Sequence, residues 1–179
     1  MDIDVLSVVL LQQFRNPVFT VSSIILDFLF SVPIIVGLTF LVYLGLKKRN
    51  FFVISLASLT NFALVFILKA IIARPRPELI ISPYTMDISG FAFPSAHAAI
   101  AFMLAVLLSK YYPKYRIPLY ALAVLTAIAR IYSGAHYLTD VIAGAAIGVL
   151  MGWVFLINEK RLLKLEAKIH KQLKSIFKI

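Results

Sequence analysis

Three short clusters of polar residues interrupt an otherwise apolar sequence, and they contain the side chains that could do chemistry. The densest cluster spans residues 130–140 and places His136 four positions before Asp140. On a helix, residues four apart share a face, so the carboxylate can bond one ring nitrogen of the imidazole. That bond fixes the tautomer and leaves the other nitrogen basic, which suits a nucleophile or a general base.

A metal site is the alternative interpretation of the pair formed by His136 and Asp140. The sequence contains no cysteine. Several arginines are expected close to the pair, so a bound cation would be repelled. We therefore predict that the site uses neither a metal ion nor a cofactor.

The first polar cluster follows an apolar segment and contains Lys69, Arg74 and Arg76. Pro75 and Pro77 cannot continue a helix, so the backbone should unwind here and turn the arginines away from the helix axis. Three cations at one place indicate an anion site. Lysine and arginine at a helix end can also simply reach for lipid headgroups, which is the alternative interpretation.

The second cluster is Pro94-Ser95-Ala96-His97, directly before another apolar segment. Ser95 is a natural N-cap, and the helix that it begins presents unpaired backbone amides at a positive dipole end, where an oxyanion can bind. His97 lies in the first turn, beside that position. Taken alone it could be an ordinary capping or interface histidine, but a second histidine on the same side of the membrane favours a functional role.

The composition is that of an integral membrane protein. Hydrophobic residues make up 61% of the 179 residues, charged residues 15%, and the mean hydropathy is +0.94. Soluble domains are about 45–50% apolar. The net charge of +10 could suggest nucleic acid. Basic and aromatic residues do not interleave as they do on nucleic-acid-binding surfaces, so we predict no such partner.

We expect an all-α, multi-pass helical bundle with about five transmembrane helices, folded as the single domain 1–179. A helix needs about 20 apolar residues to cross the hydrocarbon layer. The predicted spans are residues 21–46, 51–72, 95–109, 117–132 and 138–157. Residues 1–16 are predicted to form an interfacial helix, residues 21–157 the transmembrane bundle and residues 158–179 a basic tail.

The distribution of charge predicts the orientation of the bundle. Thirteen of the 18 lysines and arginines fall in residues 47–49, 110–116 and 158–179. The positive-inside rule places these segments in the cytoplasm, so the three polar clusters face the periplasm or exterior of the inner or plasma membrane. The tail carries apolar residues at helical spacing with lysines between them. This pattern is typical of an amphipathic helix on the anionic inner leaflet, with a partner-binding helix as the alternative.

The three clusters together resemble the three-part signature of the type 2 phosphatidic acid phosphatase family, whose membrane members include lipid phosphate phosphatases and polyprenyl diphosphate phosphatases. The matching residues are Lys69, Arg76 and Pro77, then Pro94, Ser95, Ala96 and His97, then Arg130, His136 and Asp140. Order and spacing agree throughout. Ala96 stands where the family usually has glycine and Ala129 where it usually has serine, and neither change removes a residue on which the mechanism depends.

The resemblance implies a metal-independent lipid phosphatase that works through a phosphohistidine. It assigns nucleophilic attack to His136, orientation of that imidazole to Asp140, and general acid and base catalysis to His97. Phosphate binding is assigned to Lys69, Arg76, Ser95, Ala96 and Arg130. Arg74 is one residue out of register with the motif's cation, so its predicted role is an accessory one at the entrance of the site.

The predicted partners are the bilayer and a lipid phosphate substrate. Undecaprenyl diphosphate, phosphatidylglycerol phosphate, phosphatidic acid and lipid A 1-phosphate all place a phosphate at the outer face of a membrane, and no residue separates them. A proton-coupled transporter or channel is the alternative function, but it predicts polar residues along the spans, where Asn61 and Thr126 stand nearly alone. Asp27, inside the first span, needs a partner, which can be a site cation or a hydrogen bond within the bundle.

Overall fold

A computed structural model describes residues 2–46, 49–77 and 90–177 of the chain. Within these ranges the chain forms seven α-helices and one short 3-10 helix, and no β-strand. The elements are α1 (Ile3–Gln12), α2 (Pro17–Leu29), α3 (Val32–Leu46), α4 (Arg49–Ile72), α5 (Ala96–Tyr111), η1 (Pro113–Tyr115), α6 (Arg116–Tyr132) and α7 (Leu138–Phe177). The expected all-α bundle of apolar helices is confirmed for this part of the chain.

Local sequence signals account for several helix ends. Asn16 caps α2, because its side chain accepts a hydrogen bond from the amide of Phe19 at 3.0 Å. Pro17 follows at the first helical position, where the missing amide hydrogen would have no partner in any case. The C-terminal end of α4 is at Ile72, and the next residue, Ala73, takes a positive φ of 50°. The polar segment after α4 therefore leaves the helix, as the prolines predicted.

The first predicted span, residues 21–46, is not one straight helix. It is divided between α2 and α3, which are bent by 53° at a short break after Leu29. Pro33 lies in the first turn of α3, and a proline at that place cannot donate the backbone hydrogen bond that would join the two helices. The sequence did not predict this break, because the apolar residues continue without interruption through it.

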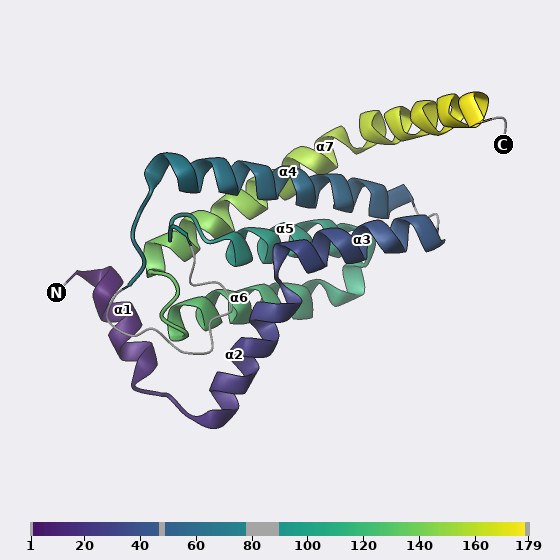
Figure 1. Cartoon of the computed structure of the whole chain (residues 1–179). Helices are drawn as coiled ribbons and strands as arrows, with labels where there is room; N and C mark the ends of the chain where they lie inside the picture. The colour runs from purple at the N-terminus through teal and green to yellow at the C-terminus, as the bar shows by residue number, and fades with distance from the viewer. Residues whose placement is uncertain (1, 47–48, 78–89, 178–179) are drawn as a thin grey trace.

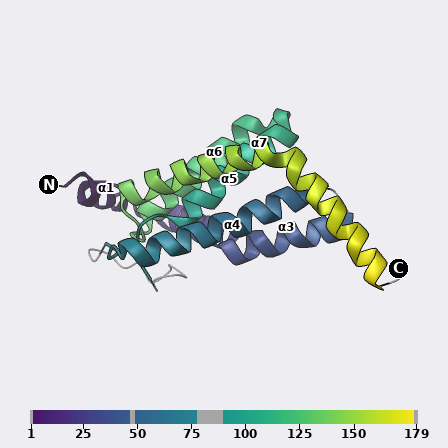
Figure 2. The same cartoon turned by 90° about the horizontal axis from the view of Figure 1, so that it is seen from above.

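The last predicted span and the predicted tail belong to one continuous helix. α7 runs for 40 residues from Leu138 to Phe177 as one helix. No glycine or proline follows Gly152 in this segment, so nothing in the local sequence ends the helix at residue 158. Figures 1 and 2 show the C-terminal end of α7 projecting away from the bundle.

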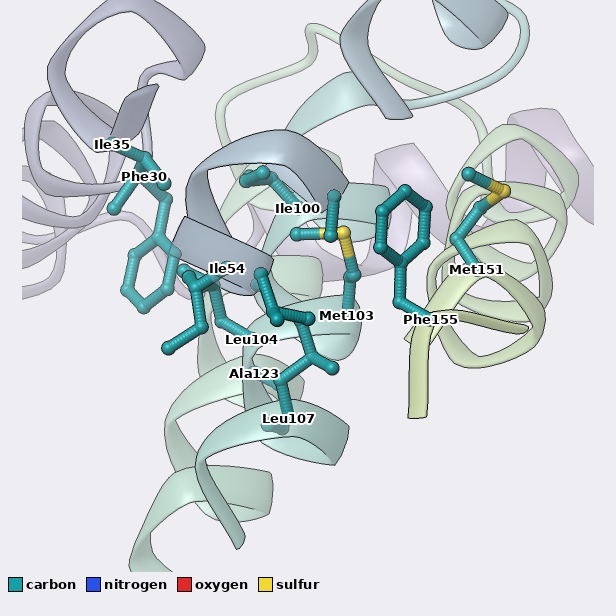
Figure 3. Packing of buried hydrophobic residues seen from close by; sticks show 14 residues of the cluster. Phe30, Ile35, Ile54, Ile100, Met103, Leu104, Leu107, Ala123, Met151 and Phe155 are labelled. Atoms are coloured by element: carbon teal, nitrogen blue, oxygen red, sulfur yellow. The ribbon is translucent and has the colours of Figure 1, made fainter. Parts of the chain in front are cut away.

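The centre of the bundle is α5, which is buried along most of its length. α4, α6 and α7 all pack against it, and Figure 1 shows α3, α4, α5 and α6 side by side. Figure 3 shows how side chains from these elements meet around α5. The labelled residues of this core are Phe30, Ile35, Ile54, Ile100, Met103, Leu104, Leu107, Ala123, Met151 and Phe155.

Two glycines let α7 lie directly against α5. A side chain on Gly148 would collide with the backbone of Ala99, and one on Gly144 with the backbone carbonyl of Ser95. Small residues four apart are a common way for helices in lipid to approach closely. The close approach at Gly144 sets the beginning of α5 beside the beginning of α7, where the amide of Ser95 donates a hydrogen bond to the carbonyl of Asp140 at 3.0 Å.

Helix length does not by itself establish five spans. Among the described residues, α4 and α7 are long and apolar enough to cross a bilayer, and the bent pair of α2 and α3 can count as a third span. α5 and α6 have 16 and 17 residues, short of the about 20 that a crossing needs. Many large apolar side chains are exposed on the outside of the bundle, as expected for surfaces that face lipid.

Part of the predicted topology lies outside the described residues. This applies to Lys47, Lys48 and Lys178 of the predicted cytoplasmic side, and to residues 78–89 of the loop between α4 and α5.

Candidate active site

The three polar clusters meet at one end of the bundle, where hydrogen bonds to backbone carbonyl groups join them. Lys69 donates to two carbonyl groups of the loop that leads into the second cluster. Arg76 donates through Nη1 to the carbonyl of Ala135 at 3.0 Å, which joins the first cluster to the third. The amide of Ser95 joins the second cluster to the third through the carbonyl of Asp140. Residues that are up to 71 positions apart in the sequence are thus assembled into one site.

The second cluster has the capping geometry that the sequence predicted. α5 begins at Ala96, and the hydroxyl of Ser95 accepts a hydrogen bond from the amide of Ala98 at 3.4 Å. Ser95 is fully buried. Ala96 and His97 lie in the first turn, on the wall of a cavity described below. The N-terminus of α5, with its positive dipole end, therefore lies beside this cavity, a position that favours an anion.

The third cluster differs from its prediction in one respect. His136 does not lie on the helix with Asp140, because α7 begins two residues later, at Leu138. Gly134, with a φ of 74°, makes the turn that follows α6, and the amide of His136 donates to the carbonyl of Arg130 at 3.2 Å. The Nδ1 atom of His136 still lies 3.7 Å from Oδ2 of Asp140. The two side chains are neighbours, but at a distance longer than a hydrogen bond.

His136 is buried among positive charges. Its exposed surface is 2%. Burial first, and then the charges of Arg130, Arg76 and Lys69, hold the pKa of His136 well below its ordinary value of 6.5. The imidazole is therefore neutral at neutral pH, the state in which a ring nitrogen can act as a nucleophile. The charges of three predicted phosphate-binding residues therefore act on this histidine.

Arg130 has an acidic partner that the sequence did not assign. Its Nη1 atom forms an ion pair with Oδ1 of Asp27, from α2. The Nε2 atom of His97 lies 3.2 Å from the same carboxylate oxygen and 3.2 Å from the backbone carbonyl of Asp27. Asp27 thus pairs with a site cation, one of the two alternatives left open by the sequence, and it also contacts the second histidine.

Besides Oδ1 of Asp27, which lies in the ion pair with Arg130, three buried polar atoms of the site have no hydrogen-bond partner among the described residues. They are Nε and Nη2 of Arg130 and Nδ1 of His136. Buried polar groups are nearly always hydrogen-bonded, so orphaned donors at a site require an explanation. Two unused donors on one guanidinium match the geometry with which arginine binds two oxygens of a phosphate.

Arg74, predicted to be an accessory residue at the entrance of the site, is paired with two carboxylates. One of its terminal nitrogens binds Asp4, from α1, and the other binds Asp140, each at 2.7 Å. Its guanidinium also lies over the ring of Tyr137, 4.3 Å from the centroid. Sequence reasoning missed Asp4 entirely, because nothing in the pattern of α1 indicates a contact with residues 70 or more positions away.

A cavity of about 710 Å³ adjoins the site. Its polar lining includes Asp27, Lys69, Arg76 and His97. The rest of the wall is largely apolar and comes from the break between α2 and α3, from α4 and from Phe91. His136, Arg130 and Ser95 do not line the cavity and are almost fully buried, with exposed surfaces of 2%, 2% and 0%. Arg130 is paired with Asp27, which does line the cavity.

Within the described residues, no three histidine, aspartate or glutamate side chains are grouped closely enough to hold a metal ion. The charged side chains that surround His136 are mainly cationic, so the donor set does not fit a bound cation.

The fold and the site define a class of protein: an all-helical membrane bundle with a cationic pocket and two histidines at one end. The chain belongs to the PAP2 superfamily, which matches residues 50–163. This match includes all three clusters and leaves out α1, α2 and α3.

Named relatives of the chain are phosphatases, that is, hydrolases of phosphoric ester bonds. Phosphatidylglycerophosphatase B of Bacillus subtilis is 30% identical over 156 residues, which are 81% of this chain and 75% of that protein. The lipid A 4'-phosphatase of Bacteroides thetaiotaomicron is 41% identical over 68 residues, which are 37% of this chain and 30% of that protein. The crystal structure of Aquifex aeolicus LpxE superimposes with a TM-score of 0.73 at 26% identity, over 87% of this chain and 96% of that one.

Proposed function

We propose that this protein is an integral membrane lipid phosphatase that removes a phosphate monoester or diphosphate group from a membrane lipid. The observation that carries the proposal is the buried Arg130, which has two unpartnered donors, lies near His136 and is paired with Asp27 at the polar end of a largely apolar cavity. The phosphate would lie at the polar end and the lipid chains along the apolar wall. A soluble sugar phosphate would gain nothing from such a wall.

The phosphate-binding role falls to Lys69, Arg76 and Arg130, together with Ser95 and the amides near Ala96. In the proposed complex, Nε and Nη2 of Arg130 donate to two phosphate oxygens while Nη1 keeps its contact with Asp27. The cations then stabilise the negative charge that develops on the equatorial oxygens during transfer. Because the side chains supply this charge, the proposed mechanism uses no metal ion and no cofactor.

The reaction proceeds in two steps. In the first, Nε2 of His136 attacks phosphorus in line, the bond between phosphorus and the lipid oxygen breaks, and His97 gives its proton to the leaving oxygen. In the second, His97 takes a proton from water, the water oxygen attacks phosphorus, and the bond to His136 breaks to release phosphate. Asp140 faces Nδ1 of His136 and stabilises the positive charge that the ring acquires.

Asp27 is a positioning residue in this scheme. Its carboxylate and carbonyl groups hold one ring nitrogen of His97, so the plane of the ring is fixed before the substrate enters.

The relatives named as phosphatidylglycerophosphatase B and lipid A phosphatases support a lipid phosphate as the substrate class. Undecaprenyl diphosphate, phosphatidylglycerol phosphate, phosphatidic acid and lipid A 1-phosphate remain the candidates.

We further propose five spans in an inner or plasma membrane, with the site facing the periplasm or exterior and the basic end of α7 on the cytoplasmic leaflet. Because the chain has no cysteine, single cysteines introduced at residues 91 and 171 can be labelled by an impermeant reagent, and the proposal requires that only the first react in intact cells.

The catalytic proposal is tested by assaying the four candidate lipids in detergent micelles with EDTA present. Wild type and His136→Ala are compared by phosphate release. His170→Ala is the matched control, because His170 lies on the exposed C-terminal part of α7. We expect turnover of at least one lipid, loss of that turnover in His136→Ala and full activity in His170→Ala. Turnover that requires a divalent metal, or that survives in His136→Ala, contradicts the mechanism.

A further inference from the structure

The N-terminal helix α1 contacts the active site through the buried carboxylate of Asp4. Oδ1 of Asp4 accepts a hydrogen bond from the amide of Thr139 at 2.9 Å. Oδ2 accepts two more, from the hydroxyl of Thr139 and from Nη2 of Arg74, both at 2.7 Å. Asp4 is 5% exposed, so these hydrogen bonds are buried contacts and not surface contacts. Although burial opposes ionisation, the hydrogen bonds from Arg74 and Thr139 hold the pKa of Asp4 below its ordinary value.

Arg74 connects Asp4 to Asp140, the residue that faces the proposed nucleophile His136. Its Nη1 atom donates to Oδ1 of Asp140 at 2.7 Å and to the hydroxyl of Thr139 at 2.7 Å. The other oxygen of Asp140 accepts from the amide of Tyr137 at 2.9 Å and lies 3.7 Å from Nδ1 of His136. Each oxygen of Asp140 therefore has a fixed partner, and the carboxylate cannot rotate without breaking one of them.

The charges explain why Asp4 is needed as well as Arg74. The side chain of Arg74 is 28% exposed, whereas that of Asp140 is fully buried. A partly exposed arginine with one carboxylate partner could swing outward into solvent or toward an entering phosphate. A planar guanidinium that binds two carboxylates through separate nitrogens is held in one orientation. Asp4 thereby keeps Arg74 on Asp140 and away from the phosphate.

We infer that Asp4 and Arg74 are positioning residues, which act through Asp140 to hold His136 ready for attack. This inference rests on the proposed phosphatase function, and it assigns α1 a part in the site. Asp4 lies outside residues 50–163, so the superfamily match gives it no role. The inference also separates Arg74 from Lys69, Arg76 and Arg130, since Arg74 does not bind the substrate.

The test compares kcat with KM in Arg74→Ala, with the best lipid substrate of the four-lipid panel. Loss of positioning should lower kcat by about 10- to 100-fold, the size expected when a reacting group is displaced by about 1 Å. KM should change less than about twofold, because no contact with phosphate is lost. A rise in KM at unchanged kcat would instead make Arg74 a phosphate ligand or entrance residue, and would overturn the inference.

Asp4→Asn provides a second variant that keeps the shape and the acceptor for Thr139 but removes the charge that holds Arg74. It should lower kcat in the same direction, and the double variant with Arg74→Ala should be no slower than Arg74→Ala alone, because both act through one chain of contacts. Asp2→Asn is the matched control. Asp2 is the exposed N-cap of the same helix, and its replacement removes the negative charge that stabilises the N-terminus of α1 without touching Arg74.

The outcomes separate this inference from the proposed function. Activity that survives in His136→Ala contradicts the proposed function itself. An inactive His136→Ala together with wild-type kcat in Arg74→Ala contradicts the positioning role alone. Equal losses of kcat in Asp2→Asn and Asp4→Asn also overturn it, because they would show that α1 matters only for folding. Arg74→Lys keeps one charged donor and should recover part of the kcat lost in Arg74→Ala, which guards against a variant that merely fails to fold.

Discussion

Replacing Asp27 with asparagine changes one charge in the interior and keeps the shape of the side chain. The side chain of Arg130 is 2% exposed and that of Asp27 is 8% exposed, so the ion pair has little contact with solvent. Removing one member of a buried pair leaves the other charge uncompensated, at a cost of about 3–5 kcal/mol. We expect Asp27→Asn to lower the free energy of unfolding by this amount, and to lower kcat because His97 loses its charged partner.

The assay is unfolding of the purified protein in mixed micelles by increasing sodium dodecyl sulfate, followed by circular dichroism of the helices. Arg130→Met and the double variant complete the cycle. The double variant should be more stable than the sum of the two losses predicts, by about 0.5–3 kcal/mol. Glu166→Gln is the control, because its partner Arg49 is 51% exposed and such pairs contribute about 1 kcal/mol or less. Wild-type stability of Asp27→Asn, or strict additivity in the cycle, would refute the reasoning.

Three further predictions concern packing, substrate and pH. Gly148→Leu should lower the free energy of unfolding by at least about 1–3 kcal/mol, because the new side chain meets the backbone of Ala99; unchanged stability in the same unfolding assay would contradict the close approach of α5 and α7. Ala70→Phe should narrow the cavity and raise KM for long-chain lipid phosphates by about tenfold, or about 1.4 kcal/mol. Its KM for p-nitrophenyl phosphate should stay the same, and an equal rise for both substrates would show that the cavity does not hold the chains. Because folding lowers the pKa of His136, the imidazole stays unprotonated as the pH falls through 6.5, so the acid limb of kcat/KM attributable to this residue should lie below pH 6.5 once the ionisation of the lipid phosphate has been divided out. A limb at 6.5 or above that belongs to the enzyme would contradict the buried environment of this histidine.

The parts of the site that lie within one short segment were predictable from the sequence. Capping by Ser95 depends on local backbone chemistry, and so do the end of α4 before Pro75 and the turn at Gly134. The spacing of His136 and Asp140 also predicted that the two side chains would be neighbours. The first residue of α7 was not predictable, because the spacing between His136 and Asp140 is the same whether His136 precedes the helix or lies in its first turn.

Contacts between distant segments could not be predicted in this way. Asp27 and Asp4 lie on helices that precede the signature clusters, and their partners depend on how the helices pack. The sequence did contain one usable signal, the repeat of Gly144, Gly148 and Gly152 at intervals of four, which indicates close packing of α7. The break after α2 had a signal as well, in Pro33, but the continuous apolar composition of this segment outweighed it.

The central claim is that His136 carries the phosphoryl group during the reaction. The direct measurement is to mix the protein with excess substrate in the presence of EDTA, stop the reaction in alkali within milliseconds, and map the added phosphate by mass spectrometry. The account predicts a phosphate on His136 that forms and decays at rates consistent with turnover, and none on His97 or His170. Rapid turnover with no phosphate on the protein, or phosphate on a different residue, would contradict it.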